Sequence, residues 1–129
     1  MSGFRTGLGR ARGLGASKHG VGHFIAERGT GAALLLLSFW LIPFALAAAR
    51  GGYVAAREML GSPVNSALAI LTLVVGLYHA MMGVRVIVED YIERRSTKAI
   101  LLLLNALIGW GAAAMGTVAL LKLTFGSGS

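Results

Sequence analysis

The stretch SPVNSALAILTLVVGLYHAMMGVRVIVEDY, residues 62–91, decides the fold. It contains no Asp, Glu, Lys or Arg over residues 64–84, and a helix needs about 20 such residues to cross the hydrocarbon core of a bilayer. Ser62 followed by Pro63 provides an N-cap residue and then proline at the first helical position. The pattern therefore predicts a membrane-spanning helix that starts at Pro63 and runs to the end of the stretch.

Two further apolar runs flank this helix and predict helices of their own. The first covers residues 24–49 and the second covers residues 98–123. Pro43 lies inside the first, which a membrane helix tolerates when neighbouring groups satisfy the freed carbonyl. We expect residues 50–61 to form a surface loop. The sequence thus predicts an all-α membrane protein, with three transmembrane helices in a membrane domain of residues 23–129.

The composition of the whole chain agrees with a membrane location. Of the 129 residues, 56% are apolar and 13% are charged, whereas about 25% of the residues of a soluble globular domain are charged. The mean hydropathy is +0.74. No cysteine is present, which excludes a disulfide scaffold, a cysteine nucleophile and an iron–sulfur cluster held by this chain's own cysteines.

The net charge is +7, and the positive residues lie mostly beside the apolar runs. We therefore expect the chain to contact membrane lipid and no nucleic acid. Residues 1–22 are basic, contain no acid and predict a flexible arm. Eight positive residues lie at or before the start of the first predicted helix or around the link between the second and third, against three on the other side: Arg5, Arg10, Arg12, Lys18, Arg28, Arg94, Arg95 and Lys98 against Arg50, Arg57 and Lys122. The N-terminus should therefore face the cytoplasm. The lack of a clear cleavage signal favours a bacterial inner membrane over a mitochondrial one.

His79 is the residue of this fold with the most informative chemistry. It lies twelve positions before Tyr91, about 18 Å along a helix, so a Tyr91 at the cytoplasmic interface places His79 near mid-membrane. Gly76 and Gly83 share its helix face and leave room for a flat group. Three interpretations stay open: a packing histidine bonded across helices, a proton relay, or an axial ligand of a haem iron.

The chain offers only one histidine at this depth. His19 and His23 lie in or beside the basic arm, too far toward the cytoplasm to ligate an iron opposite His79. A six-coordinate haem would therefore need its second histidine from another polypeptide.

A second candidate group closes the same helix at its cytoplasmic end. Asp90 shares the face of His79, and Tyr91 follows it directly. A phenol can donate a hydrogen bond to a carbonyl oxygen, and a nearby carboxylate can orient or supply a proton. We expect Arg28, at the start of the first helix, to lie at the same depth and to pair with Asp90 or another anionic group. The alternative interpretation is an acidic helix end that is simply solvated.

Two segments of the chain resemble a known family. They are HAMMGVRVIVEDY, residues 79–91, and GVGHFIAERGTG, residues 20–31. Together with three spans and an amino-terminal arm on the cytoplasmic side, they resemble the smaller cytochrome b membrane anchor of succinate:quinone oxidoreductase, which is also called succinate dehydrogenase or respiratory complex II. Many family members have aromatic side chains, often tryptophan, at the positions after the histidine of the second segment, whereas this chain has Phe24 and Ile25 there.

The resemblance implies a role for each candidate residue. His79 corresponds to an axial ligand of haem b, Tyr91 to a hydrogen-bond donor to ubiquinone, and Asp90 to its neighbour. Arg28 corresponds to an arginine near the haem propionates and the quinone. The resemblance also implies a flavoprotein subunit, an iron–sulfur subunit and a second cytochrome b anchor that supplies the other haem ligand.

The expected function is that of a subunit that is not catalytic alone. It would help to bind haem b and form part of the site at which electrons from succinate reduce ubiquinone. Two other functions stay open: a small proton-coupled transporter or channel subunit that uses His79 and Asp90 as relay groups, and a purely structural assembly factor. Only the first function requires a b-type haem.

Overall fold

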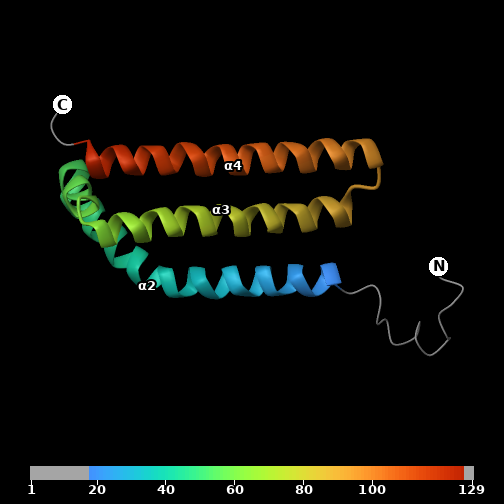
Figure 1. The fold of residues 1–129 in the computed structure, drawn as a ribbon, viewed down its shortest axis with the longest axis horizontal. Helices are drawn as coiled ribbons and strands as arrows, with labels where there is room; N and C mark the ends of the chain where they lie inside the picture. The colour runs from blue at the N-terminus through green and yellow to red at the C-terminus, as the bar shows by residue number, and fades with distance from the viewer. Residues whose placement is uncertain (1–17, 127–129) are drawn as a thin grey trace, which may run out of the picture.

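The computed structural model describes residues 18–126 and folds them into three helices. These are α2 (Lys18–Leu60), α3 (Pro63–Tyr91) and α4 (Arg95–Phe125). They run antiparallel, with α3 between its two neighbours (Figure 1), and α2 makes few contacts with α4. The described part of the chain contains no strand, so the predicted all-α class is confirmed.

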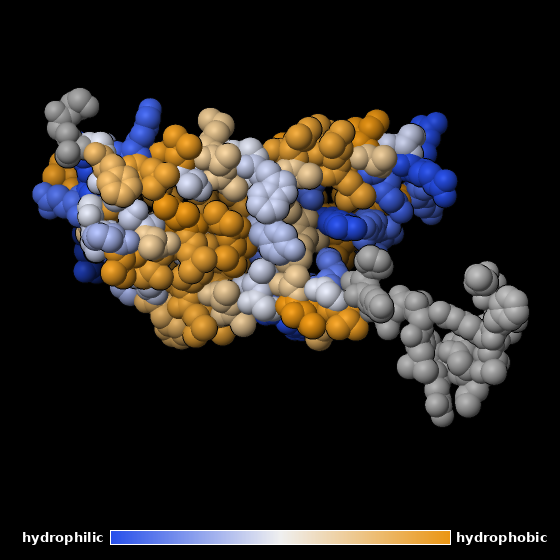
Figure 2. Space-filling view, in the orientation of Figure 1, coloured by the Kyte–Doolittle hydropathy of each residue, from blue (hydrophilic) through white to orange (hydrophobic). Residues whose placement is uncertain are grey.

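All three helices are long and apolar enough to cross a membrane. The 29 residues of α3 correspond to about 43 Å, which exceeds the hydrocarbon core of roughly 30 Å. Few side chains are buried inside the molecule, and its large apolar residues lie mostly on the outer surface. Figure 2 shows this apolar surface between polar ends. Such a surface suits lipid tails or another membrane subunit, and the chain is a multi-pass membrane protein.

The boundaries of α3 agree with the sequence prediction, although the cap differs in detail. Ser62 occupies the N-cap position, but its side chain makes no capping hydrogen bond. Its backbone carbonyl accepts a hydrogen bond from the Ser66 N–H at 3.0 Å. The helix ends after Tyr91, because Ile92 adopts an extended backbone with φ −101° and ψ 114°. The fixed φ of Pro63, rather than a serine side-chain cap, accounts for the start of the helix.

The prediction of a surface loop over residues 50–61 is wrong. Helix α2 continues through Pro43 and past the predicted end at residue 49, as far as Leu60. It is interrupted at Gly52, whose φ of 73° and ψ of −163° are not helical. Glycine adopts a positive φ at little cost, and the alanine, arginine, glutamate, methionine and leucine that follow are good helix formers. The chain therefore turns at one glycine and resumes its helix.

The other helix ends differ from the predicted ones by a few residues. Helix α2 starts at Lys18 rather than at residue 24, and α4 covers Arg95–Phe125 rather than 98–123. Polar residues extend both helices because backbone hydrogen bonds do not require apolar side chains. The rest of the predicted basic arm, residues 1–17, lies outside the described residues.

Hydrogen bonds hold the last turns of α2 against the end of the molecule at which α3 begins. Trp40 Nε1 donates to Asn65 Oδ1 at 3.0 Å, and Asn65 Nδ2 donates to the Met59 carbonyl at 2.9 Å. The Arg57 guanidinium donates to the carbonyl of Gly126, which follows α4. The turned segment is therefore tied to both other helices.

Small residues on α4 allow it to approach α3 closely. Gly109 and Ala113 are buried, and Gly116 lies on the same face. A Cβ atom at Gly109 would overlap the side chain of Met81, and one at Gly116 would lie 2.5 Å from Leu73 Cδ2. Close contact through small residues is a usual way for membrane helices to associate, and here it fixes the position of α3.

Candidate functional site

His79 lies in the membrane-spanning part of α3 and is hydrogen-bonded to α2. Its Nδ1 atom is 2.8 Å from Oγ1 of Thr30, in a partly buried contact. The ring also lies beside the backbone of Gly31, where a Cβ atom would be 3.6 Å from the imidazole Cε1. The protein therefore fixes the ring through one nitrogen and through van der Waals contact with a glycine.

The sequence did not single out Thr30, although it is a polar residue at the edge of an apolar run. Its hydroxyl also lies 2.7 Å from the carbonyl oxygen of Ala26, one turn earlier in α2. One hydroxyl thus joins the backbone of α2 to the imidazole of α3. Thr30 becomes a functional candidate only because the packing of the two helices places it opposite His79.

The two glycines on the face of His79 have different surroundings. A Cβ atom at Gly76 would lie 3.7 Å from Leu34 Cδ2 of α2, whereas one at Gly83 would meet no atom within 4 Å. The expectation that both glycines leave room for a flat group therefore holds at Gly83, and Leu34 covers the face at Gly76.

Asp90 and Tyr91 lie at the exposed end of α3. The Tyr91 side chain is 79% exposed. Among residues 21–126, whose side chains the structure describes, Asp90 forms no ion pair, and neither residue forms a side-chain hydrogen bond. Both groups are therefore available to a molecule or subunit outside this chain.

Arg28 does not lie at the depth of Asp90, contrary to expectation. It precedes Thr30, which contacts His79, by two residues. Because the helices are antiparallel, Arg28 lies about 3 Å from the level of His79, whereas Asp90 lies about 16 Å from it. The two charges are therefore separated by roughly 14 Å along the helix axes. The reason is that α2 starts at Lys18 rather than at residue 24, so Arg28 lies three turns into the helix instead of in its second turn.

The side chain of Arg28 is exposed on the outer face of α2. Two residues correspond to about 200° around a helix, so Arg28 lies on nearly the opposite side from Thr30. Its guanidinium carbon is 5.4 Å from the ring centroid of Phe24, a distance at which a cation is attracted to an aromatic face. The sequence prediction did not anticipate this orientation.

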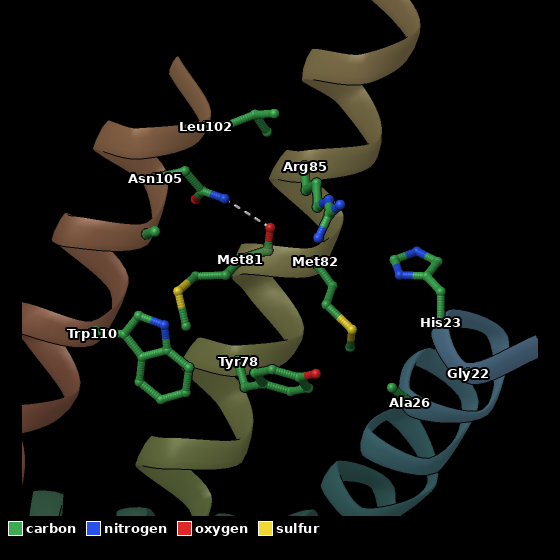
Figure 3. Close-up of a pocket in the computed structure, with 11 residues that line it drawn as sticks. Gly22, His23, Ala26, Tyr78, Met81, Met82, Arg85, Leu102, Asn105 and Trp110 are labelled. Atoms are coloured by element: carbon green, nitrogen blue, oxygen red, sulfur yellow. Dashed lines mark hydrogen bonds between the residues drawn. The ribbon is translucent and has the colours of Figure 1, made fainter. Parts of the chain in front are cut away.

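A groove of about 580 Å³ opens between the three helices, beside the face that carries His79. The sequence did not indicate it, because its lining comes from separate helices. Figure 3 shows Tyr78 and Met82 of α3 in the middle of this groove, with His23 on its α2 side and Trp110 on its α4 side. Asn105 donates a hydrogen bond to the Met81 carbonyl at 2.9 Å. The lining is mainly apolar and includes two basic side chains: Gly22, His23, Ala26, Tyr78, Met81, Met82, Arg85, Leu102, Asn105, Ala106 and Trp110.

The described residues can supply one ligand to a metal, and not a complete set. No group of three or more His, Asp or Glu residues among them could hold a metal ion. His23 lies seven residues before Thr30, about 10 Å along α2 from the level of His79. A lone imidazole with Nδ1 held by the protein, and with no protein partner for Nε2 among the described residues, fits one axial position of a haem.

Comparison with known proteins identifies the family. The family model of the succinate dehydrogenase/fumarate reductase transmembrane subunit matches residues 3–113. The chain belongs to this family. The succinate dehydrogenase hydrophobic membrane anchor subunit of Rickettsia conorii is 34% identical to this anchor subunit over 102 residues, which cover 78% of this chain and 81% of the relative.

The same similarity extends to a second bacterial genus. The succinate dehydrogenase hydrophobic membrane anchor subunit of Paracoccus denitrificans is 27% identical over 120 residues, which cover 91% of this anchor subunit and 90% of the relative. No solved structure gives a significant match. The resemblance noted from the sequence is thus confirmed: the chain is a membrane anchor of the succinate dehydrogenase type, which implies catalytic subunits and membrane lipid as its partners.

Proposed function

We propose that this anchor subunit contributes one axial ligand, His79, to a haem b shared with a second cytochrome b anchor. It also forms part of the ubiquinone-reduction site in electron transfer from succinate to quinone. The supporting observation is the position of His79 within a membrane-spanning helix, with its Nδ1 bonded to Thr30. The complex further contains a flavoprotein and an iron–sulfur subunit, and it lies in a bacterial inner membrane with the N-terminus of this chain cytoplasmic.

The chain's own residues would hold the haem through one edge of α3. When bound, haem b supplies an electron carrier inside the bilayer. Nε2 of His79 would hold the iron, Thr30 would hold the other nitrogen, and Gly83, where no atom lies within 4 Å of the Cβ position, would leave room for the group.

The exposed end of α3 would provide the quinone contacts. The hydroxyl of Tyr91 donates a hydrogen bond to a quinone carbonyl oxygen, and Asp90 orients that group or supplies a proton. Arg28 acts by its positive charge on the propionates and the quinone. Because Arg28 is exposed on the outer face of α2, it would act on groups held outside this chain.

The proton-relay alternative gains no support from the geometry. His79 and Asp90 are eleven residues apart on α3, which corresponds to roughly 16 Å. In the described part of the chain, the hydrogen bond of His79 runs to Thr30 of α2, and from there to backbone carbonyls, which cannot pass a proton on.

A reduced-minus-oxidised visible spectrum of the purified complex tests the proposal. His79→Leu is expected to remove or convert the low-spin haem signal, whereas His23→Leu, at a histidine of α2, is expected to leave it intact. An unchanged spectrum with full haem content in His79→Leu would contradict the assignment. Quinone reduction need not stop when haem is lost, because electrons can reach quinone directly from an iron–sulfur centre.

A further inference from the structure

We infer that Thr30 is a positioning residue for the haem ligand. Its hydroxyl oxygen accepts the Nδ1 proton of His79 and so selects the imidazole tautomer whose Nε2 lone pair is free to bind iron. This inference rests on the proposed role of His79 and adds to it the group that sets its protonation pattern.

The hydroxyl of Thr30 contacts three polar atoms but has only one proton to donate. A threonine hydroxyl has one proton to donate and two lone pairs to offer. Its Oγ1 lies 2.7 Å from the carbonyl oxygen of Ala26 and 3.2 Å from that of Glu27, and a carbonyl oxygen can only accept. The hydroxyl proton therefore belongs to the backbone of α2. What remains for His79, at 2.8 Å, is a lone pair, so Nδ1 is the donor.

The opposite arrangement leaves two polar groups without partners. If Thr30 donated to Nδ1, the 2.7 Å contact with the Ala26 carbonyl would bring two oxygens together with no proton between them. The single N–H proton of the neutral imidazole would then sit on Nε2, for which the described residues provide no acceptor. A polar group left unsatisfied away from water costs about 1–3 kcal/mol, and within lipid this cost favours the first arrangement.

The surroundings make the hydroxyl a directed acceptor. The hydrogen bond back to the preceding turn restricts the Thr30 side chain to rotamers that reach the Ala26 carbonyl. Gly31 keeps the backbone close to the ring, since even a Cβ atom there would lie 3.6 Å from Cε1 of His79. The imidazole is thus held in both rotation and tautomer. Partners of this kind raise the basicity of a ligand, and their loss typically lowers metal affinity by about 10- to 100-fold.

The test compares threonine variants in the assembled membrane complex. Thr30→Val keeps the shape but removes the acceptor, Thr30→Ser keeps the acceptor, and Thr72→Val is the matched control. Thr72 makes the same kind of bond, to the Leu68 carbonyl at 2.7 Å, but within α3 alone. The readouts are haem per complex when haem is limiting, the electron paramagnetic resonance spectrum of the oxidised complex, and the haem midpoint potential.

Only the variants that remove or weaken the hydrogen-bond acceptor at residue 30 are expected to change the readouts. Thr30→Val lowers haem affinity by about 10-fold or more, shifts the resonance spectrum and raises the midpoint potential. A tenfold change in the ratio of oxidised to reduced haem affinity corresponds to about 59 mV. Thr30→Ser and Thr72→Val retain the values of the unmodified complex. If the valine complex does not accumulate, Thr30→Cys, with a similar size and a weaker acceptor, is expected to shift all three readouts in the same direction.

The two hypotheses fail in different ways. If Thr30→Val or Thr30→Cys matches the unmodified complex in all three readouts while His79→Leu loses the low-spin haem, the inference about Thr30 is overturned and the ligand assignment stands. If His79→Leu retains the full low-spin signal, both are overturned. Equal changes in Thr30→Val and Thr72→Val overturn the positioning role in favour of general helix packing.

Discussion

Replacing Tyr91 by phenylalanine removes one hydroxyl group from the end of α3 and leaves the ring in place. The side chain is 79% exposed, and its hydroxyl bonds to no other group in the described part of the chain. Surface substitutions of this kind change stability by no more than about 0.5 kcal/mol. A larger loss of function therefore reports a contact with something outside this chain.

The size of that loss follows from the kind of bond removed. A hydrogen bond between neutral groups contributes about 0.5–1.5 kcal/mol, and one to a charged group about 1.5–3 kcal/mol. Negative charge develops on the quinone oxygen as it is reduced, so the bond from Tyr91 strengthens toward the transition state. We expect Tyr91→Phe to lower succinate:quinone turnover by at least about tenfold, which corresponds to roughly 1.4 kcal/mol.

The assay measures succinate oxidation by the purified complex with two acceptors in parallel: a ubiquinone analogue, and a soluble artificial acceptor that bypasses the membrane site. Tyr53→Phe is the matched control, because Tyr53 is 66% exposed and follows the helix break at Gly52, at the other end of the molecule. Only Tyr91→Phe with the ubiquinone analogue should be slow. Equal loss with both acceptors indicates failed assembly, and full turnover with both refutes the reasoning.

Three further predictions address packing, charge and protons. Gly109→Leu should lower the stability of the complex to heat by about 1–3 kcal/mol through overpacking. Gly111→Leu should not, because no atom lies within 4 Å of the Cβ position there. Equal effects of the two variants would contradict the close α3–α4 contact. Arg28→Leu should slow quinone reduction without changing topology, since other positive residues remain in the arm; inverted topology reporters in complexes with normal quinone kinetics would show that its charge only sets orientation. Asp90→Asn should slow quinone reduction less at low pH than at high pH if the carboxyl delivers protons, and a loss independent of pH would indicate a role in shape alone.

The sequence predicted α3 well because its boundaries are local. Pro63 fixes the backbone at the start, and the uncharged run sets the minimum length. The end of the first helix was not predictable in the same way. Residues 50–61 are polar enough for a loop, yet residues 55–60 are good helix formers. Their helix is held by hydrogen bonds that join Met59 to Asn65 and Arg57 to Gly126.

The residues of the site differ in the same way: some are evident within one helix, and others depend on how two helices pack. His79 was identifiable from one helix, since an ionisable group in a long apolar run is unusual whatever surrounds it. Thr30 acquires its meaning from the register between α2 and α3, which no pattern within either helix reveals. The depth of Arg28 was misjudged for a related reason, because it depended on a helix start six residues earlier than expected.

The position of α3 between two neighbours that hardly touch makes the described helices a single layer, as Figure 1 shows. A layer has two broad apolar faces, and lipid tails satisfy these faces as well as another protein would. Apolar area alone therefore gives a newly inserted chain no reason to leave the lipid for a partner. Recognition of a partner then rests on close packing and on the few polar atoms that lipid tails cannot satisfy, such as Nε2 of His79. Insertion therefore needs only the apolar helices, whereas a partner differs from lipid in what it offers to that nitrogen.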